Sequence, residues 1–288
     1  MAKILFIGDV VGKGGRKVLR QVLPKWQQQH RPDVTIVNVE NLAHGKGVTI
    51  KTIEELKDLK IEAYTSGNHI FKKGELSADC FEKYPHLIRP ANFADNLPGH
   101  GYYRFAKKTQ PSSVLRTPSP NRGKEIVNGA MQQYLIINLN GQVFMEEQFD
   151  GAIANPFLAV DRLLTEQAQK GDIIIVDFHA EATSEKIAFG WHVDGRVTGV
   201  FGTHTHVPTA DARVLPNGTA YITDVGMTGA KDGIIGVIRN NVLAKFLDPN
   251  VKFKNEPEEE GVLQISGVLV ETLEDEKAQS IKKLYQEV

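Results

Sequence analysis

Residues 3–41 read KILFIGDVVGKGGRKVLRQVLPKWQQQHRPDVTIVNVEN and place an amphipathic segment between two short runs rich in β-branched and other apolar residues. The runs, residues 4–7 and 34–39, predict strands that are buried on both faces. Residues 14–29 carry apolar side chains at helical spacing, and Pro24 is expected to bend this helix. The order strand, helix, strand indicates the first crossover of a parallel sheet.

The same alternation extends outward along the chain. Residues 49–59 predict a helix capped by Thr49 or Thr52, and residues 63–65 predict a third strand. A second series starts with a helix at 155–169, where Asn155 is the expected cap and Pro156 the first helical residue. It continues with a helix at 183–191, capped by Thr183 or Ser184, and with strands at 173–178, 197–201, 219–223 and 262–270. The chain is therefore predicted to be α/β.

The segment between the two series lacks this order. Residues 102–105 predict a short strand, and residues 107–129 are rich in Lys, Arg, Ser, Pro and Asn, which predicts an exposed excursion. Residues 131–138 and 142–146 flank Asn140-Gly141, a strong signal for a tight hairpin. No internal repeat or linker is evident, so we expect one domain over residues 1–288 that contains two sheets.

The composition excludes several classes of protein. Lys and Arg number 34 and Asp and Glu 35, so a net charge of −1 gives no electrostatic reason to expect duplex nucleic acid or an anionic membrane as partner. A single cysteine, Cys80, allows neither an intrachain disulfide nor a thiolate metal cluster. The first apolar run is too short for a signal peptide, and no run approaches the length of a membrane span. The expected location is the cytoplasm.

Polar side chains gather directly after the predicted strands. Open α/β sheets bind ligands at the carboxyl ends of their strands, so these side chains are expected to converge. Carboxylate, amide and imidazole groups suit iron, manganese or zinc. The residues are Asp9, Glu40, Asn41, Asn68, His69, His179, His204 and His206.

Each of these residues also has a purely structural explanation. Asp9 could cap a helix, Glu40-Asn41 could be a polar turn, Asn68 could serve a left-handed turn, and His179 could be a buried histidine with a satisfied hydrogen bond. His204 and His206 favour a metal more strongly, because imidazoles two residues apart in extended chain point to the same side and would repel each other when charged. The coincidence of all these residues with strand ends favours a metal site over separate structural roles.

Two further motifs could serve either substrate binding or chain turns. His44-Gly45-Lys46-Gly47 could offer backbone amides and a cation to a phosphate. Residues 224–229 follow a strand and could close over the site.

Taken in order, the motifs resemble those of the calcineurin-like metallophosphoesterases, and more closely their YmdB-like group of bacterial 2′,3′-cyclic-nucleotide phosphodiesterases. The group's pattern also accounts for two departures from the wider superfamily: Val10-Val11 after Asp9, and Glu40-Asn41 in place of a bridging aspartate. The matching stretches are IGDVVG (7–12), VNVENLAHGKG (37–47), SGNH (66–69), DFHAEATSEK (177–186), GTHTH (202–206) and AYITDVGMTG (220–229).

This resemblance implies a four-layer αββα sandwich, with two mixed sheets flanked by helices, as a single metallophosphoesterase domain. It also implies two transition-metal ions, with iron preferred and manganese or zinc as alternatives. One ion would be held by Asp9, Glu40, Asn41 and His206, and the other by Glu40, Asn68, His179 and His204, so that Glu40 bridges. The metal-bridged hydroxide would attack a 2′,3′-cyclic nucleotide, and His69 would act as general acid to give a 3′-nucleotide.

Two rival functions remain open from the sequence. One is a broader phosphodiesterase or phosphomonoesterase that acts on RNA ends, nucleotides or phosphoproteins. The other is a metal-stabilised regulatory protein with little turnover. The expected partner is a small phosphodiester, and the sequence leaves a homo-oligomer open.

Overall fold

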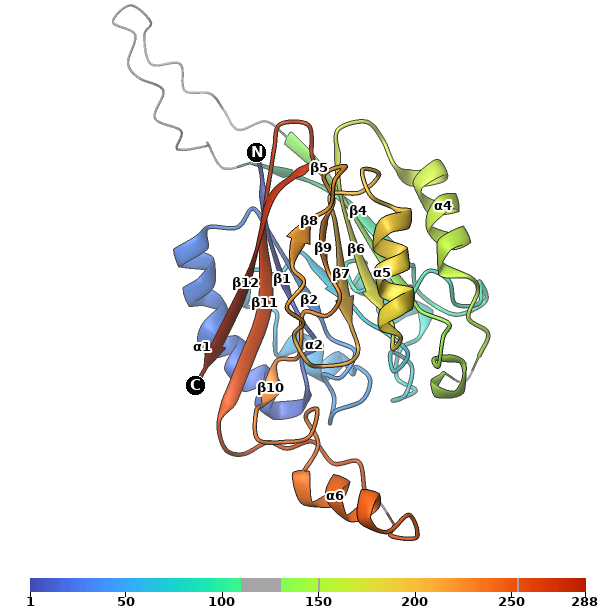
Figure 1. The fold of residues 1–288 in the computed structure, drawn as a ribbon, viewed down its shortest axis with the longest axis vertical. Coiled ribbons are helices and arrows are strands. Elements are labelled where there is room, and N and C mark those ends of the chain that lie inside the picture. The colour runs from blue at the N-terminus through green and yellow to red at the C-terminus, as the bar shows by residue number, and fades with distance from the viewer. Residues whose placement is uncertain (110–130, 150, 253) are drawn as a thin grey trace, which may run out of the picture.

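The computed structural model describes residues 1–109, 131–149, 151–252 and 254–288, which form two six-stranded sheets packed face to face (Figure 1). The first sheet has the order β10-β11-β1-β2-β3, with β12 paired to β11. In it, β1, β2 and β3 run parallel, whereas β11 is antiparallel to β1, β10 and β12. Its strands are β1 (Lys3–Ile7), β2 (Val34–Asn38), β3 (Ala63–Thr65), β10 (Gly229–Ala230), β11 (Leu263–Thr272) and β12 (Ala278–Glu287).

The second sheet has the order β4-β5-β6-β7-β9-β8. Its four central strands are parallel, and β4 and β8 are antiparallel to their neighbours. The strands are β4 (Tyr102–Lys108), β5 (Met131–Asn140), β6 (Asp172–His179), β7 (Gly199–Thr203), β8 (Arg213–Val214) and β9 (Ala220–Ile222).

Helices cover the outer faces of both sheets, α1 on the first and α4 with α5 on the second (Figure 1). The alternation of side chains explains the layers, since Ile4 and Phe6 of β1 pack between the sheets while Leu5 and Ile7 belong to the core under α1. The predicted αββα sandwich is thus confirmed. The helices are α1 (Gly12–His30), α2 (Ile50–Glu54), α3 (Ala78–Lys83), α4 (Pro156–Gln167), α5 (Thr183–His192) and α6 (Arg239–Leu247), with a 3₁₀ turn at Glu146–Gln148.

The predicted hairpin at Asn140-Gly141 is wrong. β5 continues through Asn140 between β4 and β6, so both of its edges are already paired. A Cβ at Gly141 would lie 2.5 Å from the Cβ of Ala180, so the glycine permits a close approach to the chain after β6 instead of a turn. Residues 143–145 form a turn, and the 3₁₀ segment starts at Glu146.

Other predictions differ in their boundaries. Lys107 and Lys108 belong to β4, and the rest of the predicted excursion, apart from Thr109, lies outside the described residues. The predicted helix at 49–59 is shorter, since α2 ends at Glu54; Thr49 caps it in a reciprocal capping box with Thr52. α5 starts after Ala182 without a side-chain cap, so neither predicted cap serves, and α1 continues through Pro24. The predictions did not include α3, α6 or β12.

The parallel strands place their carboxyl ends at one end of the sandwich. Helix α6, which lies between β10 and β11 in the chain, projects from the lower end of the view in Figure 1. None of the helices in the described ranges is long and apolar enough to cross a bilayer.

Candidate metal centre

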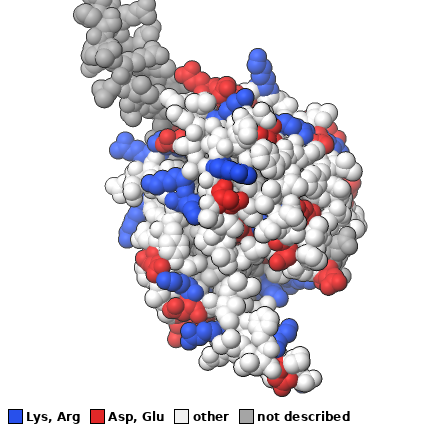
Figure 2. Space-filling view, viewed as in Figure 1, with Lys and Arg blue, Asp and Glu red and all other residues white. Residues whose placement is uncertain are grey.

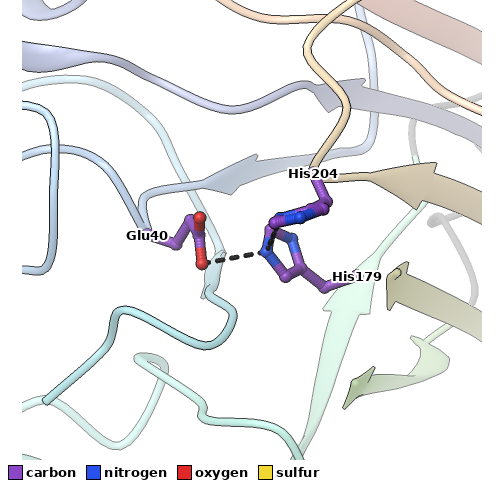
Figure 3. A group of neighbouring side chains, drawn as sticks. All are labelled: Glu40, His179 and His204. Atoms are coloured by element: carbon purple, nitrogen blue, oxygen red, sulfur yellow. Dashed lines mark hydrogen bonds and ion pairs between the residues drawn. The ribbon is translucent and has the colours of Figure 1, made fainter. Parts of the chain in front are cut away.

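The structure brings side chains from both sheets together at the strand ends. Figure 3 shows Glu40, which follows β2, directed at the ring of His179 at the end of β6, with His204 beside it after β7. His179 Nε2 lies 2.9 Å from Glu40 Oε2, 3.1 Å from Asn68 Oδ1 and 3.0 Å from His204 Nδ1. These four residues are the ones that the resemblance assigned to a single ion.

The contacts of His179 Nδ1 determine which of the two ring nitrogens carries the proton. Thr203 Oγ1 donates its single proton to Asp177 Oδ1 (2.7 Å). The Thr203 hydroxyl oxygen must therefore accept from His179 Nδ1, which lies 2.8 Å away. His179 Nε2 then carries a lone pair. His204 Nε2 lies 2.9 Å from Glu181 Oε2, and this carboxylate favours a proton on that nitrogen. In the neutral ring with its proton on Nε2, His204 Nδ1 carries a lone pair that faces His179 Nε2.

With the two rings in these tautomers, four electron-pair donors converge without a proton between them. Lone pairs of His179 Nε2, His204 Nδ1, Asn68 Oδ1 and a Glu40 carboxylate oxygen would repel one another unless a cation joined them. Glu40, His179 and His204 also offer ligand atoms that all lie within 4.8 Å of one another. Two imidazoles, an amide oxygen and a carboxylate suit a transition metal. The residues present therefore fit a metal ion.

Two buried carboxylate oxygens support the same conclusion. Asp9 Oδ1 and Glu40 Oε1 are inaccessible and have no hydrogen-bond partner among the described residues. His69 Nδ1 lies 3.1 Å from Glu40 Oε1 but not in hydrogen-bond geometry. Burial raises the pKa of Asp9 well above its usual range, and the neighbouring carboxylates of Glu40, Asp224 and Asp177 raise it further. A cation would offset this concentration of negative charge.

Burial also prepares His179 as a ligand. It lowers the pKa of His179 to about 4, so the ring is neutral at physiological pH, as a metal ligand must be. Burial likewise lowers the pKa of His206. By contrast, burial raises the pKa of Asp177, behind His179, to about 7.

The remaining predicted residues form the adjoining half of the site. His206 Nδ1 donates to the carbonyl of Ile235 (2.8 Å), and its Nε2 accepts from Asn41 Nδ2 at 3.1 Å. Asn41 Oδ1 accepts from His69 Nδ1 (3.1 Å), so the amide oxygen faces His69 and not His206. Asp9 joins this half to the other, because its Oδ2 accepts from the backbone N–H of His204 (3.2 Å).

The backbone conformation of His204 and His206 corrects one argument from the sequence. His204 and His206 have φ of 99° and 68°, so the chain between them is a strained turn and not extended. The two rings accordingly serve different halves, His204 at His179 and His206 at Asn41.

The site opens into a cleft of about 450 Å³. Glu40, Asn41, His69, His204 and His206 line it, so a molecule in the cleft would meet the candidate metal ligands directly. The other lining residues come from several segments of the chain and are Val11, Gly45, Lys46, Gln148, Glu181, Thr205, Ile235, Gly236, Val237, Asn255 and Pro257.

Comparison with known proteins identifies the family. A family model described as "YmdB-like protein" matches residues 5–118 and 115–284. The chain belongs to the YmdB-like family. Over 281 residues it is 42% identical to the 2′,3′-cyclic-nucleotide 2′-phosphodiesterase of Bacillus subtilis, covering 97% of this chain and 94% of that protein.

Two crystal structures share the YmdB-like fold. A hypothetical protein from Thermus thermophilus superposes with a TM-score of 0.82 at 33% identity, covering 99% of both chains. A protein described as a novel phosphatase from Mycoplasma pneumoniae also gives 0.82, at 31% identity, covering 99% of this chain and 93% of that one. The resemblance inferred from the sequence and the prediction of a phosphoesterase are confirmed.

Sequence reasoning missed the residues that orient the candidate ligands of this YmdB-like site. Asp177 and Thr203 fix the ring of His179, and Glu181 fixes that of His204. Asp177 could have been found from its position, because it lies two residues before His179 in a strand and so shares its face. The contact of Thr203 with Asp177 joins different strands and has no local signal.

Proposed function

We propose that this YmdB-like protein is a dinuclear-metal phosphodiesterase that hydrolyses 2′,3′-cyclic nucleotides to 3′-nucleotides. The main support for this proposal is the convergence of lone pairs around His179 Nε2 at the base of an open cleft. The activity of the Bacillus subtilis relative supports the choice of substrate. On the face in Figure 2, basic and acidic side chains of the described residues interleave, which agrees with a small substrate better than with a duplex.

The proposed ligands divide into two sets that share Glu40. Asn68, His179 and His204 would complete the first set, where lone pairs already converge. Asp9, Asn41 and His206 would complete the second, and Asn41 would have to turn its amide oxygen toward His206. When bound, transition metals such as iron, manganese or zinc would acidify water and neutralise phosphoryl charge.

The chain's own contribution to proton transfer falls to His69. Its Nδ1 faces the side-chain amide of Asn41 at 3.1 Å. Once Asn41 had turned its oxygen toward His206, its NH₂ group would donate to His69 Nδ1, and the ring proton available for transfer would be on Nε2. His69 lines the cleft and is 17% exposed at its side chain, which leaves the ring accessible to substrate. Protonation by Nε2 would let the ribose 2′ oxygen leave as an alcohol.

The test is a substrate panel assayed with metal-free and metal-reconstituted protein. We expect 2′,3′-cyclic AMP to yield 3′-AMP only after reconstitution, and 3′,5′-cyclic AMP and AMP to react much more slowly. Faster turnover of phosphomonoesters would favour a phosphatase, as the description of the Mycoplasma pneumoniae protein suggests. Metal binding without turnover of any phosphoester would favour the regulatory alternative.

A further inference from the structure

The turn that carries His204 and His206 is strained and must be held by other contacts. Both residues have positive φ, 99° and 68°, a conformation that L-residues with a Cβ seldom adopt. Such conformations persist where surrounding interactions over-determine them. Besides the bond from the N–H of His204 to Asp9, such contacts are made by Thr205, the residue between the two histidines.

Thr205 is bound to a single buried carboxylate. Its backbone N–H and its Oγ1 both donate to Asp224 Oδ2, at 3.1 and 2.7 Å. The other oxygen of Asp224 accepts from the N–H of Gly226 (2.8 Å). Asp224 is fully buried, and it follows β9, next to β7 in the sheet.

A buried lysine forms an ion pair with the Asp224 carboxylate. Lys186 Nζ lies 2.8 Å from Asp224 Oδ2, and Lys186 is only 1% exposed. Its stem passes β7 at Gly202, where a Cβ would lie 3.3 Å from Lys186 Cδ and 1.7 Å from the carbonyl oxygen of Thr223. A buried ion pair seldom adds more stability than apolar side chains of the same size would. The carboxylate of this ion pair also binds Thr205, which lies between two candidate ligands. The ion pair is therefore better explained by the conformation of the turn than by stability.

We propose that Asp224, neutralised by Lys186, is a positioning residue that holds the turn at Thr205 so that His204 and His206 face the two halves of the metal site. The inference rests on the proposed function, because it assumes that these histidines bind metal. Asp224 acts through Thr205 and does not itself touch the substrate.

The variant Thr205→Val tests this without leaving an unpaired buried charge. It removes the hydroxyl that donates to Asp224 at 2.7 Å while keeping the volume of the side chain. We expect the affinity of the metal-free protein for manganese, measured by competition with a chelator, to fall about 10–100-fold, as for other residues that orient ligands. Thr205→Ser keeps the hydroxyl and should restore the affinity. Asp224→Asn should weaken binding at least as much as Thr205→Val.

Thr198→Val is the matched control. Thr198 is 3% exposed and precedes β7 at the end remote from the site, and its hydroxyl accepts from the N–H of Ile174 (3.1 Å). The control should lower the melting temperature without changing manganese affinity. Equal affinities for Thr205→Val and Thr198→Val, beside a wild type that binds manganese, would overturn the positioning role alone. A wild type that binds no manganese, zinc or iron would overturn the proposed function and this inference together.

Discussion

Replacing Asp177 by Asn should reverse the chain of hydrogen bonds behind His179. In the wild type, Asn38 Nδ2 donates to Asp177 Oδ2 (2.8 Å), and Thr203 donates to Asp177 Oδ1. Asn38 cannot turn over without losing the bond that its Oδ1 accepts from the N–H of Glu40 (3.0 Å). The new amide must therefore turn its oxygen to Asn38 and its NH₂ group to Thr203. Thr203 would then donate to His179 Nδ1, and the proton on His179 would move to Nε2, facing the metal.

The size of the effect follows from the cost of undoing this reversal. To offer a lone pair at Nε2, His179 must return its proton to Nδ1 and leave one buried polar group unsatisfied, at a cost of about 1–3 kcal/mol. At about 1.4 kcal/mol per factor of ten, metal affinity should fall roughly 5–150-fold. The fold should survive, because the replacement has the same shape and removes a buried charge.

Two measurements follow the reversal directly. Nitrogen-15 spectra of the metal-free imidazoles should show His179 protonated on Nδ1 in the wild type and on Nε2 in Asp177→Asn. Chelator competition at pH 8, above the pKa of Asp177 (about 7), should show the loss of affinity. As the pH falls through 7, Asp177 gains a proton that it can donate to Thr203, so wild-type affinity should fall toward that of the variant.

The matched control is Asp172→Asn at the opposite end of β6. Asp172 is buried and accepts from Arg104 at 2.7 and 3.0 Å, so its loss should lower stability but leave metal affinity unchanged. The reasoning fails if Asp177→Asn keeps the wild-type tautomer, or if its affinity equals that of Asp172→Asn.

Three further outcomes are expected. His69→Asn, whose amide can replace Nδ1 toward Asn41, should keep its metals and lose roughly 10²–10⁴-fold in kcat on 2′,3′-cyclic AMP. It should lose far less on bis(4-nitrophenyl) phosphate, whose leaving group needs no proton; equal losses would remove His69 from the acid role. Glu40→Ala should release both metals and Asn68→Ala chiefly one, as elemental analysis would show; equal, one-metal losses would mean that Glu40 serves a single ion. Lys46 is the one Lys or Arg in the lining of the cleft, counted over the described residues, and has no ion-pair partner among them. Lys46→Met should raise KM about fivefold, the effect of roughly 1 kcal/mol, with kcat nearly unchanged; an unchanged KM would place the substrate phosphate elsewhere.

Local sequence signals predicted most elements because they depend on side chains close together in the chain. Continuous apolar runs gave β1, β2 and β6, and Asn155 with Pro156 gave the start of α4. The same reasoning failed at Asn140-Gly141, where a turn signal is overridden by pairing on both sides of β5. β12 was missed because most of its side chains are exposed at a sheet edge, so it lacks a continuous apolar run.

The amino-acid sequence by itself determined the fold class, the family and the chemical types of the candidate ligands, because an apolar run followed by an acid, amide or imidazole is a local pattern. Only the tertiary structure decided where the protons lie. The contacts of Thr203 with Asp177, Glu181 with His204 and Thr205 with Asp224 join residues up to 26 positions apart. A hydrogen bond requires its two atoms to lie within about 3 Å in a suitable direction, and no spacing along the chain specifies that.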